Sequence, residues 1–173
     1  MPAFRRSLRL SASIVACSAL LSWAVAAAPA PAKPDDAMTQ TLAGEFALQA
    51  GDIDSAARWY LQAARSAVGD AGLAERATRI SLLANDNHIA AEALELWRQR
   101  APESLAMRGA EAALALRKGD AKIARRELQA LMRDSEGQGW RYALSVLGGG
   151  GRDPALSAKL LGELVAEDAI PDQ

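Results

Sequence analysis

A residue pair suited to ending one helix and starting the next recurs at a constant interval of 34 positions along this chain. Gly51-Asp52 is followed by Asn85-Asp86 and then by Gly119-Asp120. Glycine, and next to it asparagine, most readily adopts the left-handed conformation found after a helix C-terminus. Aspartate at the following position accepts hydrogen bonds from the free N–H groups of a new helix. The sequence therefore predicts short helices that are joined by tight turns and repeated at this constant interval.

Small and large side chains recur at the same interval around these pairs. Small residues let two antiparallel helices approach closely, and large residues fill the space between neighbouring helix pairs. The small or short positions are Gly44, Thr78 and Ala112, and then Ala56, Ala90 and Ala124. The large positions are Tyr60, Leu94 and Leu128, followed three residues later by Ala63, Trp97 and Leu131.

Composition supports an all-helical chain. Aromatic residues make up only 5% of the sequence, which argues against a β-sandwich or barrel. The predicted helices span 37–50, 53–67, 71–84, 87–100, 103–118, 121–134, 138–147 and 154–168. In the fourth pair, Asp153-Pro154 replaces the recurring dipeptide, Ala158 takes the small position and Gly162 stands where a large residue belongs. The four glycines at 148–151 are expected to form a loop.

The repeating pattern resembles the tetratricopeptide repeat over about residues 37–169, with three clear units and one degenerate unit. This resemblance implies an all-α, antiparallel helix-pair solenoid. The run from Ala74 to Ile80 is further similar to the N-terminal repeats of large tetratricopeptide lipoproteins of Gram-negative bacteria. That similarity implies an exported, non-catalytic adaptor that links a periplasmic C-terminal-processing protease to cell-wall hydrolases. Two alternatives stay open: an accessory helical domain of a longer cell-wall enzyme, and a self-assembling envelope protein.

The N-terminal segment has the order of a bacterial secretory signal. Arg5, Arg6 and Arg9 precede an uncharged run over residues 10–28, which ends in small residues suited to cleavage. Residues 1–28 are therefore interpreted as a targeting segment and 29–36 as a Pro/Ala linker. Cys17 offers lipidation as an alternative to cleavage, and an uncleaved membrane anchor is a third reading. Each reading exports the chain to the periplasm or to the periplasmic face of the outer membrane.

The residues that usually carry chemistry are scarce. The chain has one histidine, one cysteine and a net charge of −1. We therefore expect no catalytic centre, no metal site and no cofactor, and a nucleic-acid partner is not expected because no basic stripe is present. His88 near a helix start is interpreted as a surface residue. Glu103 is interpreted as an acidic first-turn residue of a helix rather than as a catalytic acid.

The first helix of each unit is expected to line a groove for a protein or peptide partner. A mixed apolar wall with alternating charge suits an extended or helical apolar segment, and tryptophan is common at binding hot spots. The predicted groove residues are Met38, Thr41, Glu45, Leu48, Gln49, Glu75, Arg79, Leu82, Leu83, Leu116, Arg117 and Trp140.

The last predicted helix is too apolar for a free end of a repeat array, which normally carries a polar face. Its apolar residues are Leu156, Leu160, Leu161, Leu164 and Val165, and a short tail, 170–173, follows. We expect this helix to be covered by a partner, by a second copy of the chain, or by further repeats of a longer protein.

Overall fold

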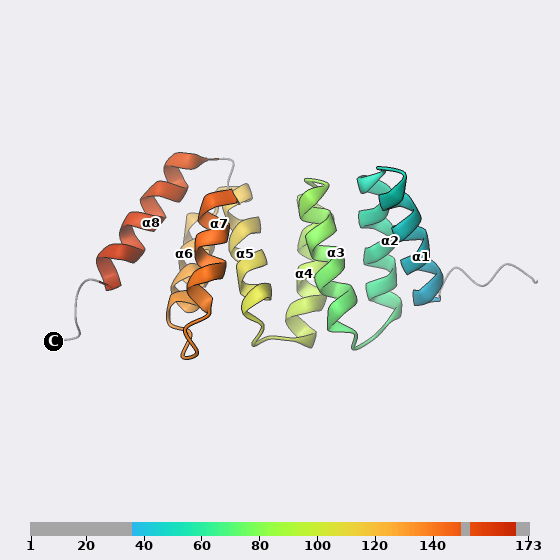
Figure 1. Cartoon of the computed structure of the whole chain (residues 1–173), viewed down its shortest axis with the longest axis horizontal. Helices are drawn as coiled ribbons and strands as arrows, with labels where there is room; N and C mark the ends of the chain where they lie inside the picture. The colour runs from blue at the N-terminus through green and yellow to red at the C-terminus, as the bar shows by residue number, and fades with distance from the viewer. Residues whose placement is uncertain (1–35, 150–152, 169–173) are drawn as a thin grey trace, which may run out of the picture. The chain divides into compact units, whose positions relative to one another are not determined.

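The structure is a computed structural model that describes residues 36–149 and 153–168 (Figure 1). Over these residues the chain forms α-helices and no strand, as predicted. The expectations for residues 1–28, the linker up to residue 35, Cys17 and the tail 170–173 lie outside the described residues. The helices are α1 (Ala37–Gln49), α2 (Ile53–Ser66), α3 (Ala71–Leu83), α4 (Asn87–Arg100), α5 (Leu105–Lys118), α6 (Ala121–Met132), α7 (Gly139–Gly149) and α8 (Pro154–Asp168).

The recurring dipeptide forms the same turn three times. Gly51, Asn85 and Gly119 all have positive φ, at 77°, 61° and 74°. At each turn the N–H of the following aspartate bonds to a carbonyl five residues earlier, with N···O distances of 2.9 to 3.0 Å. This bond defines a helix end closed by a left-handed residue, which satisfies carbonyls that the helix leaves free. The prediction of a stop signal in the sequence is confirmed.

The aspartates of the three turns start the next helices. Asp52 Oδ1 accepts from the N–H of Ser55 at 2.9 Å, and Asp120 Oδ1 accepts from Ile123 at 3.0 Å. Asp86 Oδ1 accepts from two N–H groups, those of His88 and Ile89. The side-chain and backbone hydrogen bonds from Ser55 hold the pKa of the Asp52 carboxyl below its ordinary value. Each turn therefore caps two helix ends within two residues.

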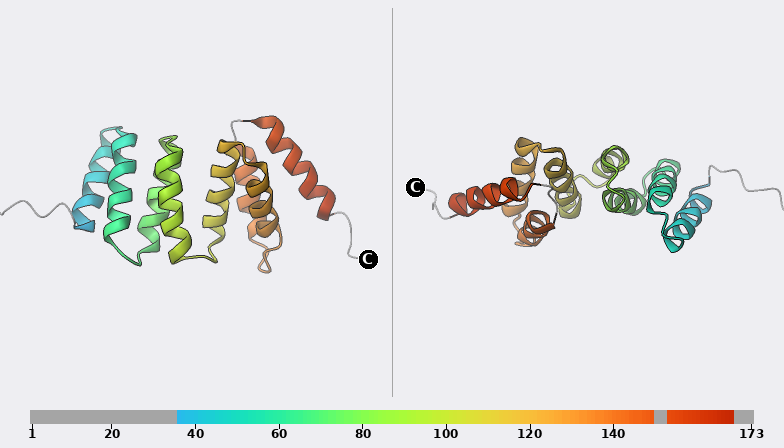
Figure 2. Two further views of the ribbon diagram at one scale, coloured as in Figure 1. Left: turned by 180° about the vertical axis from the view of Figure 1, so that it is seen from behind. Right: turned by 90° about the horizontal axis from the view of Figure 1, so that it is seen from above.

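The helices pack in the order in which they occur. Within pairs, α1 contacts α2, α3 contacts α4 and α5 contacts α6 (Figure 2). Between pairs, α5 packs on both α3 and α4, and α7 packs on both α5 and α6. The residues at the recurring small and large positions are buried at these contacts, as predicted: Ala56, Ala90, Ala124, Tyr60, Leu94 and Leu128.

Two hydrophobic clusters form the core, and they meet on α5. The first extends from α2 to Leu114 of α5, and the second from Ala112 of α5 to Leu164 of α8. Tyr60 and Trp97 are buried in the first cluster, as expected for large side chains at helical spacing. The helix α5 is thus shared by the two halves of the core.

The fourth pair departs from the predicted register. Ala158 is exposed, and the buried residues of α8 are Ser157, Leu160 and Leu164. The loop prediction is also wrong for Gly148 and Gly149, which belong to α7. The turn after α7 lacks the recurring dipeptide, so nothing in the sequence fixes α8 in the register of the earlier units; α8 packs on both α6 and α7.

One other boundary needs correction. The helix predicted from residue 103 begins at Leu105, because the Ser104 hydroxyl accepts the N–H of Met107 at 3.2 Å and caps the helix. Glu103 therefore precedes the helix and is not a first-turn residue.

Replacement of Gly44 is expected to destabilise the fold, because a Cβ at this position would lie 2.7 Å from Cε2 of Tyr60. We predict that Gly44→Ala lowers the free energy of unfolding by about 1–3 kcal/mol, since the Tyr60 ring is buried and must shift. Gly162→Ala in α8 is the matched control. Its Cβ would meet nothing within 4 Å, so it should stabilise the helix by about 0.5–1 kcal/mol. Urea unfolding followed by circular dichroism measures both, and equal signs would contradict this account.

Candidate partner-binding cleft between α7 and α8

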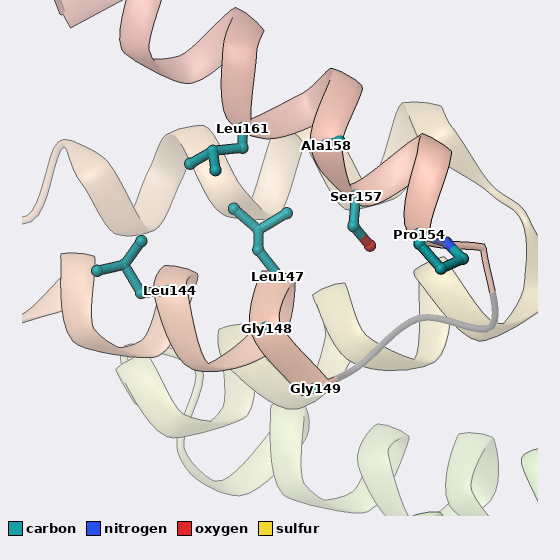
Figure 3. A pocket seen from close by; sticks show the side chains of 8 residues that line it. All are labelled: Leu144, Leu147, Gly148, Gly149, Pro154, Ser157, Ala158 and Leu161. Atoms are coloured by element: carbon teal, nitrogen blue, oxygen red, sulfur yellow. The ribbon is translucent and has the colours of Figure 1, made fainter.

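An apolar cleft of about 450 Å³ opens between α7 and α8 (Figure 3). A second cavity of about 170 Å³ adjoins it and shares Leu144, Leu147 and Leu161 with it. We refer to the two together as the α7–α8 cleft. Its lining residues are Met132, Trp140, Ala143, Leu144, Leu147, Gly148, Gly149, Pro154, Ser157, Ala158, Leu161, Leu164 and Val165.

The walls of the cleft combine core residues with residues that the core leaves exposed. On α7, Ala143 and Val146 are buried in the second cluster, whereas Leu144 remains half exposed. On α8, Leu160 and Leu164 are buried, whereas Leu161 and Val165 are exposed. Apolar residues at both i and i+1 make each helix apolar over a wider arc than one neighbour can cover. Leu147 of α7, which is half buried against the second cluster, faces Leu161 of α8 across the cleft (Figure 3).

Two acidic side chains of α8 bond to α6 and do not line the cleft. Glu163 pairs with Arg125 of α6, and both carboxylate oxygens of Glu167 accept from Gln129 Nε2 at 2.7 and 2.8 Å. These bonds tether α8 to α6. No lining residue of the cleft is charged. The Arg141 guanidinium lies 5.5 Å from the Trp140 ring centroid, a cation–π arrangement at the edge of the cleft.

Three of the predicted groove residues are engaged within the chain, and one of them is buried in the core. Leu116 is 2% exposed and belongs to the second cluster, so it cannot reach a partner. Arg117 donates to the carbonyl of Leu82 at 2.6 Å and so ties α5 to the end of α3. Glu45 accepts the Tyr60 hydroxyl and pairs with an arginine of α3. Burial and this hydrogen bond raise the pKa of Tyr60 to about 12.

The other predicted groove residues lie on the first helices at varying depth. Glu75 and Arg79 pair with each other at 2.6 Å on α3. Thr41 bonds the carbonyl of Ala37, and Leu48 and Leu82 are half buried against the first cluster. The exposed members are Met38, Gln49, Arg79, Leu83 and Trp140. Of the predicted groove residues only Trp140 lines the α7–α8 cleft. The sequence identifies Leu161 and Val165 as apolar residues in excess of what a free end carries. No sequence pattern identifies Leu144 or Leu147 as exposed binding residues.

The most buried carboxylates form a polar cluster between α4, α5 and α6. Glu111 of α5 lies 3.0 Å from Arg98 of α4 and 3.3 Å from Arg126 of α6. Glu127 lies 2.7 Å from Arg126 and 3.6 Å from Arg108. Burial, and then repulsion from Glu127, raises the pKa of Glu111, and the hydrogen bond to Glu127 raises the pKa of Arg126. Every member is paired with an opposite charge, so this cluster joins three helices.

Other candidate groups lie at the surface. His88 is strongly exposed, with Nδ1 3.2 Å from Glu92 Oε1, and Glu103 is exposed 3.9 Å from Arg108. Within 36–149 and 153–168, no three side chains of metal-binding type come together. Over the same residues, no helix has the length and hydrophobicity needed to span a membrane. Neither a protein-family model, nor a curated protein, nor a solved structure matches the chain.

Adjacent leucines of α8 test whether the cleft is surface or core. Leu160 is 1% exposed and Leu161 is 40% exposed. Leu160→Ala should lower the free energy of unfolding by about 2–4 kcal/mol because it leaves a cavity in the second cluster. Leu161→Ala should cost less than about 1 kcal/mol because its side chain already meets solvent. Urea unfolding of both variants decides the matter, and comparable losses would place the cleft inside the core.

Glu111 should make stability depend on pH. Because its pKa is raised in the fold, the folded chain binds this proton more tightly than the unfolded chain does. The contribution of Glu111 to stability therefore falls as the pH rises from its ordinary value of 4.5 through the raised pKa. Glu111→Gln removes this titration, so its free energy of unfolding relative to the parent should rise across that window. Urea titrations at several pH values measure the difference, and a constant offset would contradict the prediction.

Proposed function

We propose that this chain is a non-catalytic scaffold of the tetratricopeptide type, which binds a protein partner by taking an apolar helix into the α7–α8 cleft. The observation that carries the proposal is the cleft itself: an uncharged, leucine-lined opening with half-exposed Trp140 and Leu144 at its side. Exposed apolar surface that gathers in one place is typical of an interaction site.

Two features support a solenoid of repeated helix pairs. The same turn returns at a constant interval, with the same hydrogen bond from the second residue of each dipeptide. The first helices of the third and fourth pairs, α5 and α7, also pack on both helices of the pair before them. In a solenoid this packing continues from pair to pair and leaves surfaces that protein partners use.

The shape and chemistry of the cleft favour a helical occupant. Two helices form its walls, and a third helix can pack between them by ridges-into-grooves contacts. The lining offers leucine, alanine and valine but no charged group that would recognise a phosphate or a carboxylate terminus. An amphipathic helix with apolar residues at i, i+3, i+4 and i+7 satisfies such a surface.

The setting in the proposal is the cell envelope, and this part rests on the N-terminal sequence. The basic residues, the uncharged run and the small residues of 1–28 direct the chain outward in each of the readings given above. The partners proposed from the lipoprotein resemblance are a periplasmic protease and its cell-wall hydrolase substrates. The accessory domain of a cell-wall enzyme is the alternative, and it predicts a catalytic domain in the same gene.

A crosslinking pull-down from envelope extract tests the proposal with the tagged full chain as bait. The parent should retain a protease together with a wall hydrolase, identified by mass spectrometry. Leu161→Glu should reduce their recovery at least about tenfold, because the cleft would then bury an unpaired carboxylate against the partner.

Two variants control this experiment. Val68→Glu places the same charge on a fully exposed residue between α2 and α3, away from the cleft, and should leave recovery unchanged. Leu83→Glu changes the exposed residue of the predicted first-helix groove. Loss of capture with Leu83→Glu and retention with Leu161→Glu would move the binding surface from the cleft to that groove. If the parent and all three variants recover the protease and the hydrolase equally well, the proposal is wrong.

A further inference from the structure

Phe46 is exposed at a repeat position that is buried in the later units. Ile80 takes the same place in the second unit, and Leu114 takes it in the third. Ile80 is 8% exposed and Leu114 is 6% exposed, both within the first hydrophobic cluster, whereas Phe46 is 67% exposed. The difference follows from the position in the chain: α3 and α5 pack on preceding helices, and α1 has no such neighbour among the described helices.

Phe46 belongs to an apolar stripe along the outer side of α1. Met38, Leu42 and Phe46 are spaced four residues apart, so they lie on one face of the helix, and all three are exposed. The one charged residue within α1 is Glu45, which is engaged by the Tyr60 hydroxyl and by Arg76. The exposed face of α1 is therefore a ridge of large apolar side chains.

The last described pair of helices, α7 and α8, presents an apolar cleft where α1 presents an apolar ridge. In the earlier units, the pair α3–α4 receives α5, and the pair α5–α6 receives α7. The pair α7–α8 receives no further helix within the described residues, and an apolar cleft lies between its two helices. The chain thus presents, over its described part, a first helix without a preceding pair and a last pair without a following helix.

We propose that α1 of one copy docks in the α7–α8 cleft of a second copy, head to tail. This inference rests on the proposed function, since it names the apolar helix that the cleft takes. It continues between two copies the contact that already joins successive pairs within one copy.

The proposed contact joins two different surfaces, so each copy keeps one unused end. Such a heterologous contact builds open chains, or a ring where the rotation closes. A symmetric pairing of two α8 helices would instead stop at a dimer. The two arrangements therefore differ in the mass that they reach and in the residues on which they depend.

Two single variants and their mixture test the proposal. Phe46→Glu disrupts the apolar ridge of α1 and leaves the α7–α8 cleft intact. Leu161→Glu disrupts the cleft and leaves the ridge intact. Both residues are exposed, so the substitutions are expected to preserve the fold, which circular dichroism checks. The purified full chain in mild detergent is followed by sedimentation velocity over roughly 1–100 µM, the range of weak protein association. The parent should form species larger than a dimer, and each variant alone should associate at least about tenfold more weakly.

The equimolar mixture gives the decisive result. One intact ridge and one intact cleft remain, so the mixture should form a 1:1 heterodimer and nothing larger. Val68→Glu is the matched control and should associate like the parent. If the Phe46→Glu variant still dimerises, the pairing is symmetric. If the parent stays monomeric, no second copy docks. Either result overturns the proposal.

A disulfide trap gives a second measurement that needs no disruption of the contact. In a Cys17→Ser background, Leu42→Cys is mixed with Leu144→Cys under mild oxidation. The mixture should yield a crosslinked heterodimer in excess of either variant alone, because a disulfide needs the two Cα atoms within about 7 Å. Absence of that excess would contradict docking. If the parent is monomeric but Leu161→Glu still loses the protease and the hydrolase in the pull-down, the cleft binds another protein and only the self-docking inference fails.

Discussion

The turn formed by Gly51-Asp52 and its two repeats is the constraint on which the rest of the fold depends. Each turn closes one helix through a left-handed residue and opens the next through an aspartate, so no linker residue is left to vary. A turn of fixed geometry fixes the register of the two helices that it joins. Residues one repeat apart therefore meet the same surroundings, which is why Ala56, Ala90 and Ala124 are all fully buried.

The fourth pair lacks the recurring dipeptide in its sequence. Asp153 still caps α8, through the N–H groups of Ala155 and Leu156. The register of α8 is then set by side chains: Leu160 and Leu164 enter the core, and Glu163 and Glu167 bond to α6. The two helices leave an apolar cleft between them. The candidate site thus lies in the pair whose sequence lacks the recurring dipeptide.

Both hydrophobic contacts and ion pairs join the successive helix pairs. The first hydrophobic cluster joins α2, α3 and α4 to α5. The second joins α5 to α6, α7 and α8. In addition, Glu111 and Glu127 with their arginines connect α4, α5 and α6. Burial of these carboxylates carries a desolvation cost, which at Glu111 the ion pairs offset only in part. This is why the pKa of Glu111 is raised while the cluster remains fully paired.

The sequence by itself determined the helices and their turns, because Gly, Asn and Asp act within a few residues of where they stand. It also determined that Tyr60 and Trp97 are buried, since helical spacing assigns a face. Tertiary structure alone decided which exposed positions meet. Leu116 and Arg117 look like groove residues on a single helix, yet one is in the core and the other bonds to the end of α3. Leu144 and Leu161 form one cleft only because α8 packs outside the predicted register, and contacts between distant residues set that register.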